Sequence, residues 1–373
     1  MPSHRIALGL ALILLGCSQG GGEPVPTPVR TPSNSGGSGP NGGQTGAPGG
    51  AGGNGGGAGS PAGSGGATGG AAPAEADAQD PAADARTDEV ATPPGPGPAA
   101  GPICPPGPFE APKPGAVENV CPGFQVKYNW NEGPTWVPSQ HAFFFSNFMM
   151  RAPGPGDMIK YDPATNKCEF FIEGNGCNGL TPDRDGNLLA VCHTPRALLK
   201  YDLTTKKSTV VLDMVEGKML DSPNDIVTHS NGTIYFSNTT LELAGRPLGL
   251  GAALLRIDPA GMVSIIARGS INPLGISPDQ KRLYAMGGYW DLDDAGVPIK
   301  KAGGFTLGPD GIGVDCAGNV YIQSGAIVSP QNQVIGHVPG GTNSAFGGED
   351  RKTLLVVGGK GMHTVKMNLP GLP

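Results

Sequence analysis

The chain is poor in charge, in aromatic residues and in long apolar runs, and each shortage excludes a class of protein. Charged residues make up 15% of the 373 residues and the net charge is −6, with no basic stripe. A nucleic-acid partner is therefore not expected. The longest apolar run, residues 6–15, is too short to cross a bilayer as a helix. Helical periodicity is nearly absent, which disfavours an α/β fold.

The first residues are typical of an export signal. His4 and Arg5 provide a short positive region before the apolar run. The Leu-Leu-Gly-Cys segment ending at Cys17 resembles the lipobox of bacterial lipoproteins, in which Cys17 becomes lipid-modified after cleavage. We predict a signal peptide over residues 1–17 and a protein anchored by Cys17 in the bacterial cell envelope, periplasmic or surface-exposed. An ordinary signal peptide with a cysteine at its cleavage site is the alternative.

Residues 18–103 consist mostly of Gly, Ala, Pro, Ser and Thr with scattered acids. Because large aliphatic and aromatic side chains are almost missing, burial cannot offset the entropy of ordering this segment. We predict a disordered linker over 18–103. The remaining residues, 104–373, number about 270 and suffice for one large β domain.

Six cysteines remain beyond Cys17, an even number that suggests disulfides in an exported chain. A bond between Cys104 and Cys121 would pin the start of the domain. A hairpin turn at 182–186 would place Cys177 opposite Cys192, but a Cys168–Cys177 bond would close a short loop equally well. No pair has the close spacing of zinc sites. The sequence leaves the pairing of these five cysteines and Cys316 open.

One unit recurs six times: an apolar strand, a polar turn with Asp, Asn or Gly, and a second apolar strand. The third copy contains residues 225–227, a turn at 230–232, and residues 233–236. The six turns fall near residues 139, 185, 231, 279, 317 and 350. This spacing suits propeller blades of four short strands, about forty residues each. We therefore predict an all-β, six-bladed β-propeller, with a β-sandwich as the alternative.

Just before the first strand of each unit stands a residue with a side-chain oxygen. These residues are Glu132, Asn178, Asn224, Asn272, Asp310 and Asn343. In a propeller they would face the central channel at one rim. Carboxylate and amide oxygens without sulfur or imidazole suit a hard cation such as Ca²⁺, or Mg²⁺ less comfortably. The alternative is that Asn and Asp only form turns at these places.

Four segments carry a resemblance to a known family: Ser222-Pro223-Asn224-Asp225, Glu132-Gly133-Pro134 followed by Trp136, Pro309-Asp310-Gly311, and residues 342–348. Over roughly residues 125–371 the chain resembles the senescence-marker-protein, gluconolactonase and luciferin-regenerating-enzyme-like family of six-bladed propellers. The resemblance implies that Glu132, Asn224, Asn272 and Asp310 bind a divalent metal. Asn178 and Asn224 then face the substrate, and Asp225 orients Asn224 or handles a proton.

Two positions depart from the family pattern. Asn272 is followed by Pro273, where relatives usually have Asn-Gly, and proline fixes the local backbone and removes an N–H. Cys192-His193 stands where relatives often carry Cys-Glu-His-Gly, so His193 is a weaker candidate for substrate binding.

The resemblance implies a metal-dependent, gluconolactonase-like hydrolase of lactones or related esters. Ca²⁺, or Mg²⁺, Mn²⁺ or Zn²⁺, would polarise the lactone carbonyl and help to form the attacking hydroxide. Asp310 or Asp225 would accept the proton of the water as the catalytic base. Phosphotriesters are a second substrate class for such a site. The alternative is a non-catalytic cell-surface propeller that binds a sugar or a protein. We expect a monomer, with Trp136 and Phe145 in the core.

Overall fold

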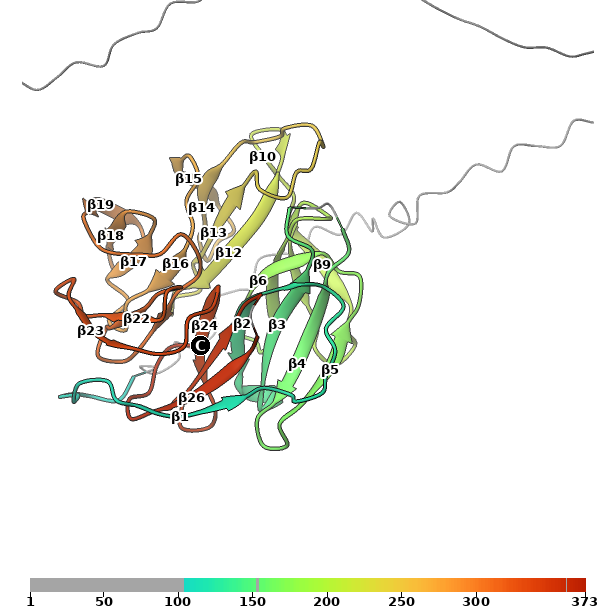
Figure 1. The fold of residues 1–373 in the computed structure, drawn as a ribbon. Coiled ribbons are helices and arrows are strands. Elements are labelled where there is room, and N and C mark those ends of the chain that lie inside the picture. Colours follow the sequence, from blue (N-terminus) through green and yellow to red (C-terminus); the bar gives the residue numbers. More distant parts are fainter. Residues whose placement is uncertain (1–103, 152–153, 360) are drawn as a thin grey trace, which may run out of the picture. The chain divides into compact units, whose positions relative to one another are not determined.

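The computed structural model describes residues 104–151, 154–359 and 361–373. The predicted signal peptide, Cys17 and the linker lie outside these described residues. Within them, six four-stranded antiparallel sheets are arranged as blades around a common axis, as Figure 1 shows. The prediction of an all-β, six-bladed propeller is confirmed.

Blades 1 to 3 follow one another along the chain, each beginning with its inner strand. Blade 1 contains β2 (Trp130–Val137), β3 (Ala142–Phe148), β4 (Asp157–Asp162) and β5 (Lys167–Ile172). Blade 2 contains β6 (Cys177–Pro182), β7 (Leu188–Cys192), β8 (Ala197–Tyr201) and β9 (Ser208–Leu212). A hairpin of β10 (Met214–Val215) and β11 (Lys218–Met219) precedes blade 3, which contains β12 (Ser222–Thr228), β13 (Ile234–Thr239), β14 (Ala253–Ile257) and β15 (Val263–Arg268).

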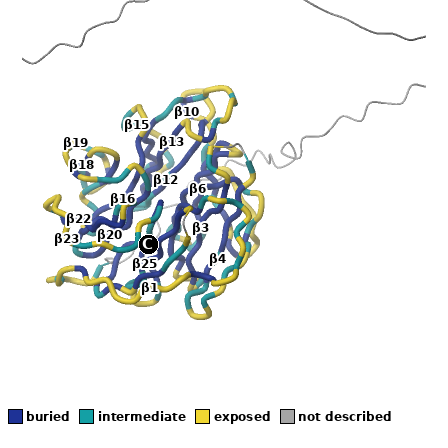
Figure 2. Tube along the Cα trace, viewed as in Figure 1, coloured by how far each residue is buried: buried dark blue, intermediate teal, exposed yellow. Residues whose placement is uncertain are grey.

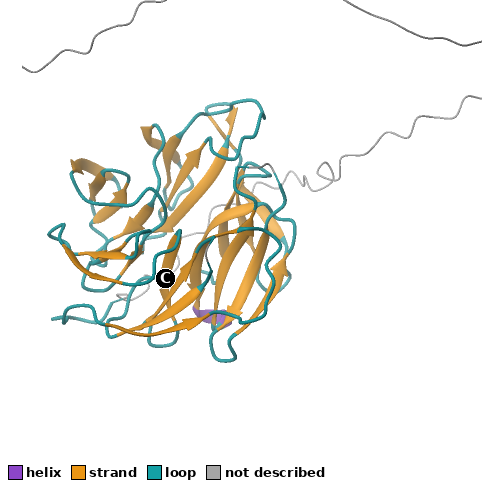
Figure 3. Ribbon diagram, viewed as in Figure 1, coloured by secondary structure: helices purple, strands orange, loops and turns teal. Residues whose placement is uncertain are grey.

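Blades 4 to 6 complete the ring. Blade 4 contains β16 (Leu274–Ile276), β17 (Arg282–Ala285), β18 (Gly288–Leu292) and β19 (Pro298–Gly303). Blade 5 contains β20 (Gly313–Val314), β21 (Val320–Tyr321), β22 (Ala326–Val328) and β23 (Val334–His337). Blade 6 contains β24 (Asn343–Gly347), β25 (Thr353–Val357), β26 (His363–Met367) and the early strand β1 (Pro114–Asn119). Apart from the 3₁₀ turn η1 (Pro138–Gln140), the described residues contain no helix (Figure 3).

Pairing of β1 with β26 closes the ring, because this blade takes strands from both ends of the described chain. Disulfides reinforce the closure. Cys104 is bonded to Cys316 in blade 5, and Cys121 is bonded to Cys168 in β5. These bonds correct the predicted Cys104–Cys121 pair and exclude Cys168–Cys177. The pairing of Cys177 with Cys192 across β6 and β7 is confirmed.

The core lies between the blades, and burial falls from the inner strands to the outer ones (Figure 2). All seven residues of β3 are buried, because neighbouring blades cover both faces of that strand. This explains why second strands such as β3 and β7 are largely continuous apolar runs and do not alternate. Phe145 is fully buried, and Trp136 packs edge-on against Phe143, so both predicted core residues lie in the core.

Replacing Phe143 by alanine should lower the free energy of unfolding by about 3–5 kcal/mol, since the ring is fully buried between Trp136 and Tyr161. Urea unfolding of the full-length chain, followed by tryptophan fluorescence, measures the change. Val117→Ala is the control, because this β1 side chain is 50% exposed. Its effect should stay within about 0.5 kcal/mol. Equal losses in both variants would contradict the assigned core.

Candidate active site

The inner strands of blades 1, 2 and 3 each contain a β-bulge, in which three steps along the inner strand match two along its partner. The bulged residues are Gly133-Pro134, Asn178-Gly179 and Asn224-Asp225. A bulge bends a strand and re-aims its side chains, and bulges are common beside active sites. Asn178 and Asn224 therefore occupy equivalent places, as the spacing predicts, whereas Glu132 lies one position earlier, at the last ladder pair.

Two glycines allow the three bulges to lie against one another. A Cβ atom on Gly133 would stand 2.4 Å from the carbonyl oxygen of Asn178. A Cβ atom on Gly179 would stand 2.8 Å from the carbonyl oxygen of Asn224. Only glycine fits at such approaches, and Gly133 also has a positive φ of 53°. The backbone of each bulge is thus placed by the bulge of the blade before it.

Side chains continue this contact into blades 4 and 5. Asp225 accepts hydrogen bonds from its neighbour Ile226 N at 2.9 Å and from Leu274 N in blade 4 at 2.7 Å. Asn272, just before β16, donates from Nδ2 to Oδ1 of Asp310 at 3.4 Å. The structure therefore places Asn272 beside Asp310 even though Pro273 follows it.

Asn343 of blade 6 closes the ring of polar groups. Its amide nitrogen donates to Oε2 of Glu132 in blade 1. Its side chain occupies the space above Gly311, where an added Cβ would stand 1.3 Å from the Asn343 oxygen. Glu132 also accepts a hydrogen bond from Trp130 Nε1 at 2.6 Å. The six predicted ring residues thus come from six blades and are linked through successive contacts.

Negative charge on the acids of this ring would be unfavourable. Glu132 is buried and Asp310 is half-buried, and desolvation raises the pKa of both carboxyls. The charge of Asp310 raises the pKa of Glu132 further. Desolvation also raises the pKa of Asp225 to about 7, against the two hydrogen bonds from backbone N–H groups. Within the described residues, no Lys or Arg forms an ion pair with any of these three acids.

The donor set fits a hard cation. The Oδ1 atom of Asn272 is buried, and within the described part of the chain it has no hydrogen-bond partner. An unpaired oxygen next to two carboxyls that lack a neutralising cation is what an oxygen-ligated Ca²⁺ site would use. Clusters of three or more His, Cys, Asp or Glu side chains able to hold a metal do not occur among the described residues. The ring instead combines two carboxylates with amide oxygens.

The structure adds Glu242, which sequence reasoning missed. This side chain is 2% exposed, accepts a hydrogen bond from Ser222 Oγ at 2.5 Å, and lies near enough to Asp310 to raise its pKa. Burial raises the pKa of Glu242 itself, while the charges of Arg151 and Arg246 oppose the shift. Glu242 lies in the loop between β13 and β14, which has no strand pattern in its sequence. That Glu242 is the only acid in this loop was the one sequence feature that could have pointed to it.

His193 is fully buried beside the ring of Phe148, with the two ring centroids 4.9 Å apart. Neither imidazole nitrogen has a hydrogen-bond partner among the described residues. Burial lowers the pKa of His193 to about 4, assisted by the charge of Arg246. The side chain is therefore neutral at neutral pH.

A cavity of about 400 Å³ lies among the inner strands of the described residues. Asp225 and Asn343 line it, but Glu132, Asn224, Asn272 and Asp310 do not. Its walls are mainly apolar side chains of the inner strands, such as Leu180, Ile276 and Val314. We place the chemistry at the polar ring, because the perturbed acids meet there.

The propeller and its ring of oxygen-bearing side chains define a class of six-bladed β-propellers with a polar centre. The chain belongs to the SMP-30/Gluconolactonase/LRE-like family, whose model matches residues 130–359. This confirms the predicted family.

A gluconolactonase of Zymomonas mobilis is 28% identical over 270 residues, which cover 61% of this chain and 75% of the relative. A pentonolactonase of Haloferax volcanii is 27% identical over 265 residues, which cover 62% of this chain and 82% of the relative. The names of these relatives support the predicted lactonase-like hydrolase class at the level of the family.

Two solved structures share the fold. A gluconolactonase of Xanthomonas campestris aligns with a TM-score of 0.59 and 21% identity, covering 73% of this chain and 98% of that one. A calcium-binding regucalcin of Agrobacterium tumefaciens aligns with a TM-score of 0.52 and 19% identity, and the alignment covers 65% of this chain and 91% of that one. At these identities the likeness concerns the fold.

The buried, neutral His193 gives a pH prediction. Its pKa is lower in the folded chain than in the unfolded one, so the unfolded chain gains a proton first as the pH falls from about 6.5 to about 4. Stability should decrease over this window by about 3 kcal/mol through His193. Urea unfolding at several pH values should show that His193→Leu removes this part of the pH dependence. His337→Gln, at an exposed position, should leave it unchanged, and parallel curves for all three proteins would contradict the assignment.

Proposed function

We propose that this protein is a divalent-metal-dependent lactonase that opens sugar lactones or related esters at the polar ring. The observation that carries the proposal is the pairing of Glu132 with Asp310, two carboxyls with raised pKa values beside the unpaired oxygen of Asn272. Membership of the gluconolactonase family, with relatives named for gluconolactone and pentonolactone, supports the substrate class.

Glu132, Asn224, Asn272 and Asp310 would hold the cation. Ca²⁺ is our first choice, because the donors are all oxygens and a structural neighbour is described as calcium-binding; Mg²⁺, Mn²⁺ and Zn²⁺ are the alternatives. When bound, the cation would supply a Lewis acid for the lactone carbonyl and for a water molecule. Its charge would also favour the ionised forms of Glu132 and Asp310.

The proton of the attacking water is assigned to Asp225. Asp310 would be occupied as a ligand, whereas Asp225 is fixed by two backbone N–H donors and keeps free lone pairs. A carboxyl whose pKa is about 7 can accept and release a proton near neutral pH. Asn178 would orient the sugar hydroxyl groups, since its buried backbone is held by Ser146 Oγ at 2.7 Å.

Glu132→Gln and Asp310→Asn should each lower kcat/KM by about a hundredfold or more, because even changes outside the ligand shell cost 10–100-fold. The assay uses the full-length chain, a panel of sugar lactones and a phosphotriester, with each of the four metals added after chelation. Calorimetry should show weakened metal binding in both variants and unfolding should show that both remain folded. Glu118→Gln and Asp213→Asn, at exposed positions, are the matched controls.

Absence of turnover with every lactone and every metal would exclude the enzyme. The non-catalytic propeller that binds a sugar or a protein would then be favoured. Turnover of the phosphotriester in preference to lactones would reassign the substrate class, since a phosphoryl oxygen can replace the carbonyl at the same site.

We also propose that a lipid on Cys17 tethers the enzyme to the cell envelope. The support is the sequence from the positive residues to Leu-Leu-Gly-Cys, which precedes the described residues. The described part of the chain has no helix that could span a membrane. Cys17→Ser should move the protein from the membrane fraction to the soluble fraction, measured by immunoblotting after ultracentrifugation. An unchanged membrane fraction would contradict the lipid anchor.

A further inference from the structure

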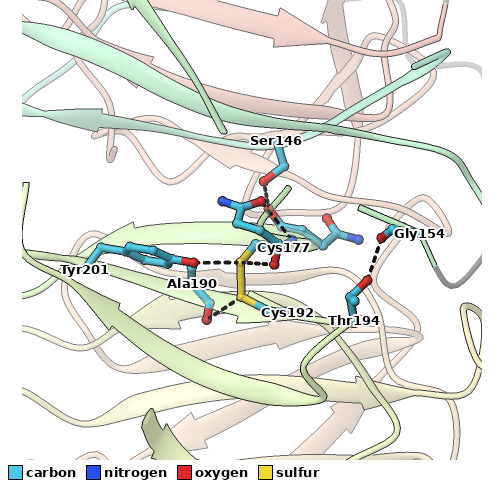
Figure 4. The surroundings of a disulfide bond; sticks show 9 residues. Ser146, Gly154, Cys177, Ala190, Cys192, Thr194 and Tyr201 are labelled. Atoms are coloured by element: carbon cyan, nitrogen blue, oxygen red, sulfur yellow. Dashed lines mark hydrogen bonds between the residues drawn. A yellow bond between two sulfur atoms is a disulfide. The ribbon is translucent and has the colours of Figure 1, made fainter. Parts of the chain in front are cut away.

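The Cys177–Cys192 disulfide occupies the ladder position next to the bulge that carries Asn178. Cys177 pairs directly with Cys192, and the register shifts immediately afterwards, before Leu180 pairs with Ala190. At the matching positions, blade 1 pairs Glu132 with Ser146 and blade 3 pairs Pro223 with Asn238. Blade 2 alone among these three has a covalent link there. Figure 4 shows this disulfide and its surroundings.

On the β6 side, the disulfide is one of three restraints on Asn178. Its neighbour Cys177 is bonded to β7, and its carbonyl oxygen accepts the Ser146 hydroxyl from blade 1 at 2.7 Å. The third restraint is the close approach of Gly133 to the same carbonyl. The two residues of a bulge lack ladder partners, so their position depends on such flanking contacts.

On the β7 side, Cys192 leads into a rim segment that is held by several backbone contacts. His193 N and Thr194 N both donate to Gly176 O, at 2.9 and 3.2 Å. Thr194 Oγ1 donates to Gly154 O at 2.5 Å (Figure 4), and Arg246 Nη2 donates to His193 O at 2.7 Å. The disulfide therefore joins the strand that carries Asn178 to the rim around His193.

We propose that the Cys177–Cys192 disulfide is a positioning element of the substrate side of the site, and that it holds Asn178 in register for the lactone. This inference rests on the proposed function. Three of the predicted metal ligands, Glu132, Asn272 and Asp310, belong to other blades and are held by side-chain contacts that involve neither cysteine. Loss of the bond should therefore disturb substrate orientation and largely spare metal binding. Misplacement of a binding group by about 1 Å can cost about a hundredfold in rate.

A second disulfide provides a matched control. Cys121–Cys168 closes a sequence separation of 47 residues, compared with 15 for Cys177–Cys192. In the chain-entropy model a longer closed loop stabilises the fold at least as much. The control bond lies between the segment after β1 and β5, away from the ring residues. Mutation is needed in place of a reductant, because Cys177 and Cys192 are fully buried.

The experiment compares full-length wild-type chain, Cys177→Ala/Cys192→Ala and Cys121→Ala/Cys168→Ala. At a temperature where all three are folded, the first variant should lose about ten- to hundredfold in kcat/KM on sugar lactones, in both KM and kcat. The control variant should stay within about twofold of wild type in kcat/KM, since it changes no contact of Asn178. Calorimetric Ca²⁺ affinity should match wild type in both. A third variant, Cys177→Ala/Cys192→Val, restores apolar volume without the bond and should stay impaired.

Four results overturn the inference. Equal loss of kcat/KM in the two alanine pairs assigns the effect to general stability. Wild-type kcat/KM in the Ala/Val variant assigns it to packing volume. Loss of Ca²⁺ affinity in Cys177→Ala/Cys192→Ala shows that the bond supports the metal site instead. An inactive wild-type chain overturns the proposed function and this inference together, whereas the other results leave the proposed function intact.

Discussion

The charge of Glu132 and Asp310 at the centre of the propeller is the constraint on which the rest of the site depends. These carboxyls belong to the first and fifth blades, so only closure of the ring brings them together. Pairing of β1 with β26 and the Cys104–Cys316 bond provide that closure. Desolvation raises the pKa of both groups, and hydrogen bonds from Trp130 and Asn343 to Glu132 offset only part of it. Two acids brought together without an ion pair to Lys or Arg among the described residues would suit a bound cation.

Close backbone contacts between neighbouring blades position the site residues around the ring. Gly133, Gly179 and Gly311 each lack the Cβ that would collide with a residue of the next blade. The bulges place Asn178 and Asn224 by backbone contact, whereas blades 4 to 6 rely on hydrogen bonds of side chains, as between Asp225 and Leu274 N. A change at one contact should therefore be felt first by the adjacent blade.

The periodic strand–turn–strand pattern was sufficient to predict the blade number, because each blade buries its inner strands on both faces. The register of oxygen-bearing residues likewise predicted which positions meet at the rim. The pattern could not reveal that Cys104 reaches Cys316, since their separation of 212 residues is bridged by ring closure and not by a local turn. Glu242 was missed because its loop has no periodicity, and the bulge that displaces Glu132 by one position depends on tertiary contacts.

In the proposed function, Asn224 and Asp225 would have two tasks that differ in charge. Asn224 cannot ionise, so its oxygen can serve as a ligand at any pH. Asp225 is held by N–H groups from blades 3 and 4, which fix the carboxyl without neutralising it with a counter-ion. Asp225 also lines the cavity among the inner strands, and desolvation raises its pKa to about 7. Asp310 would lose such a proton-accepting role on binding a cation, because a nearby dication stabilises its ionised form. In the proposed function, the carboxyls that would bind metal are therefore separate from the carboxyl that would move the proton.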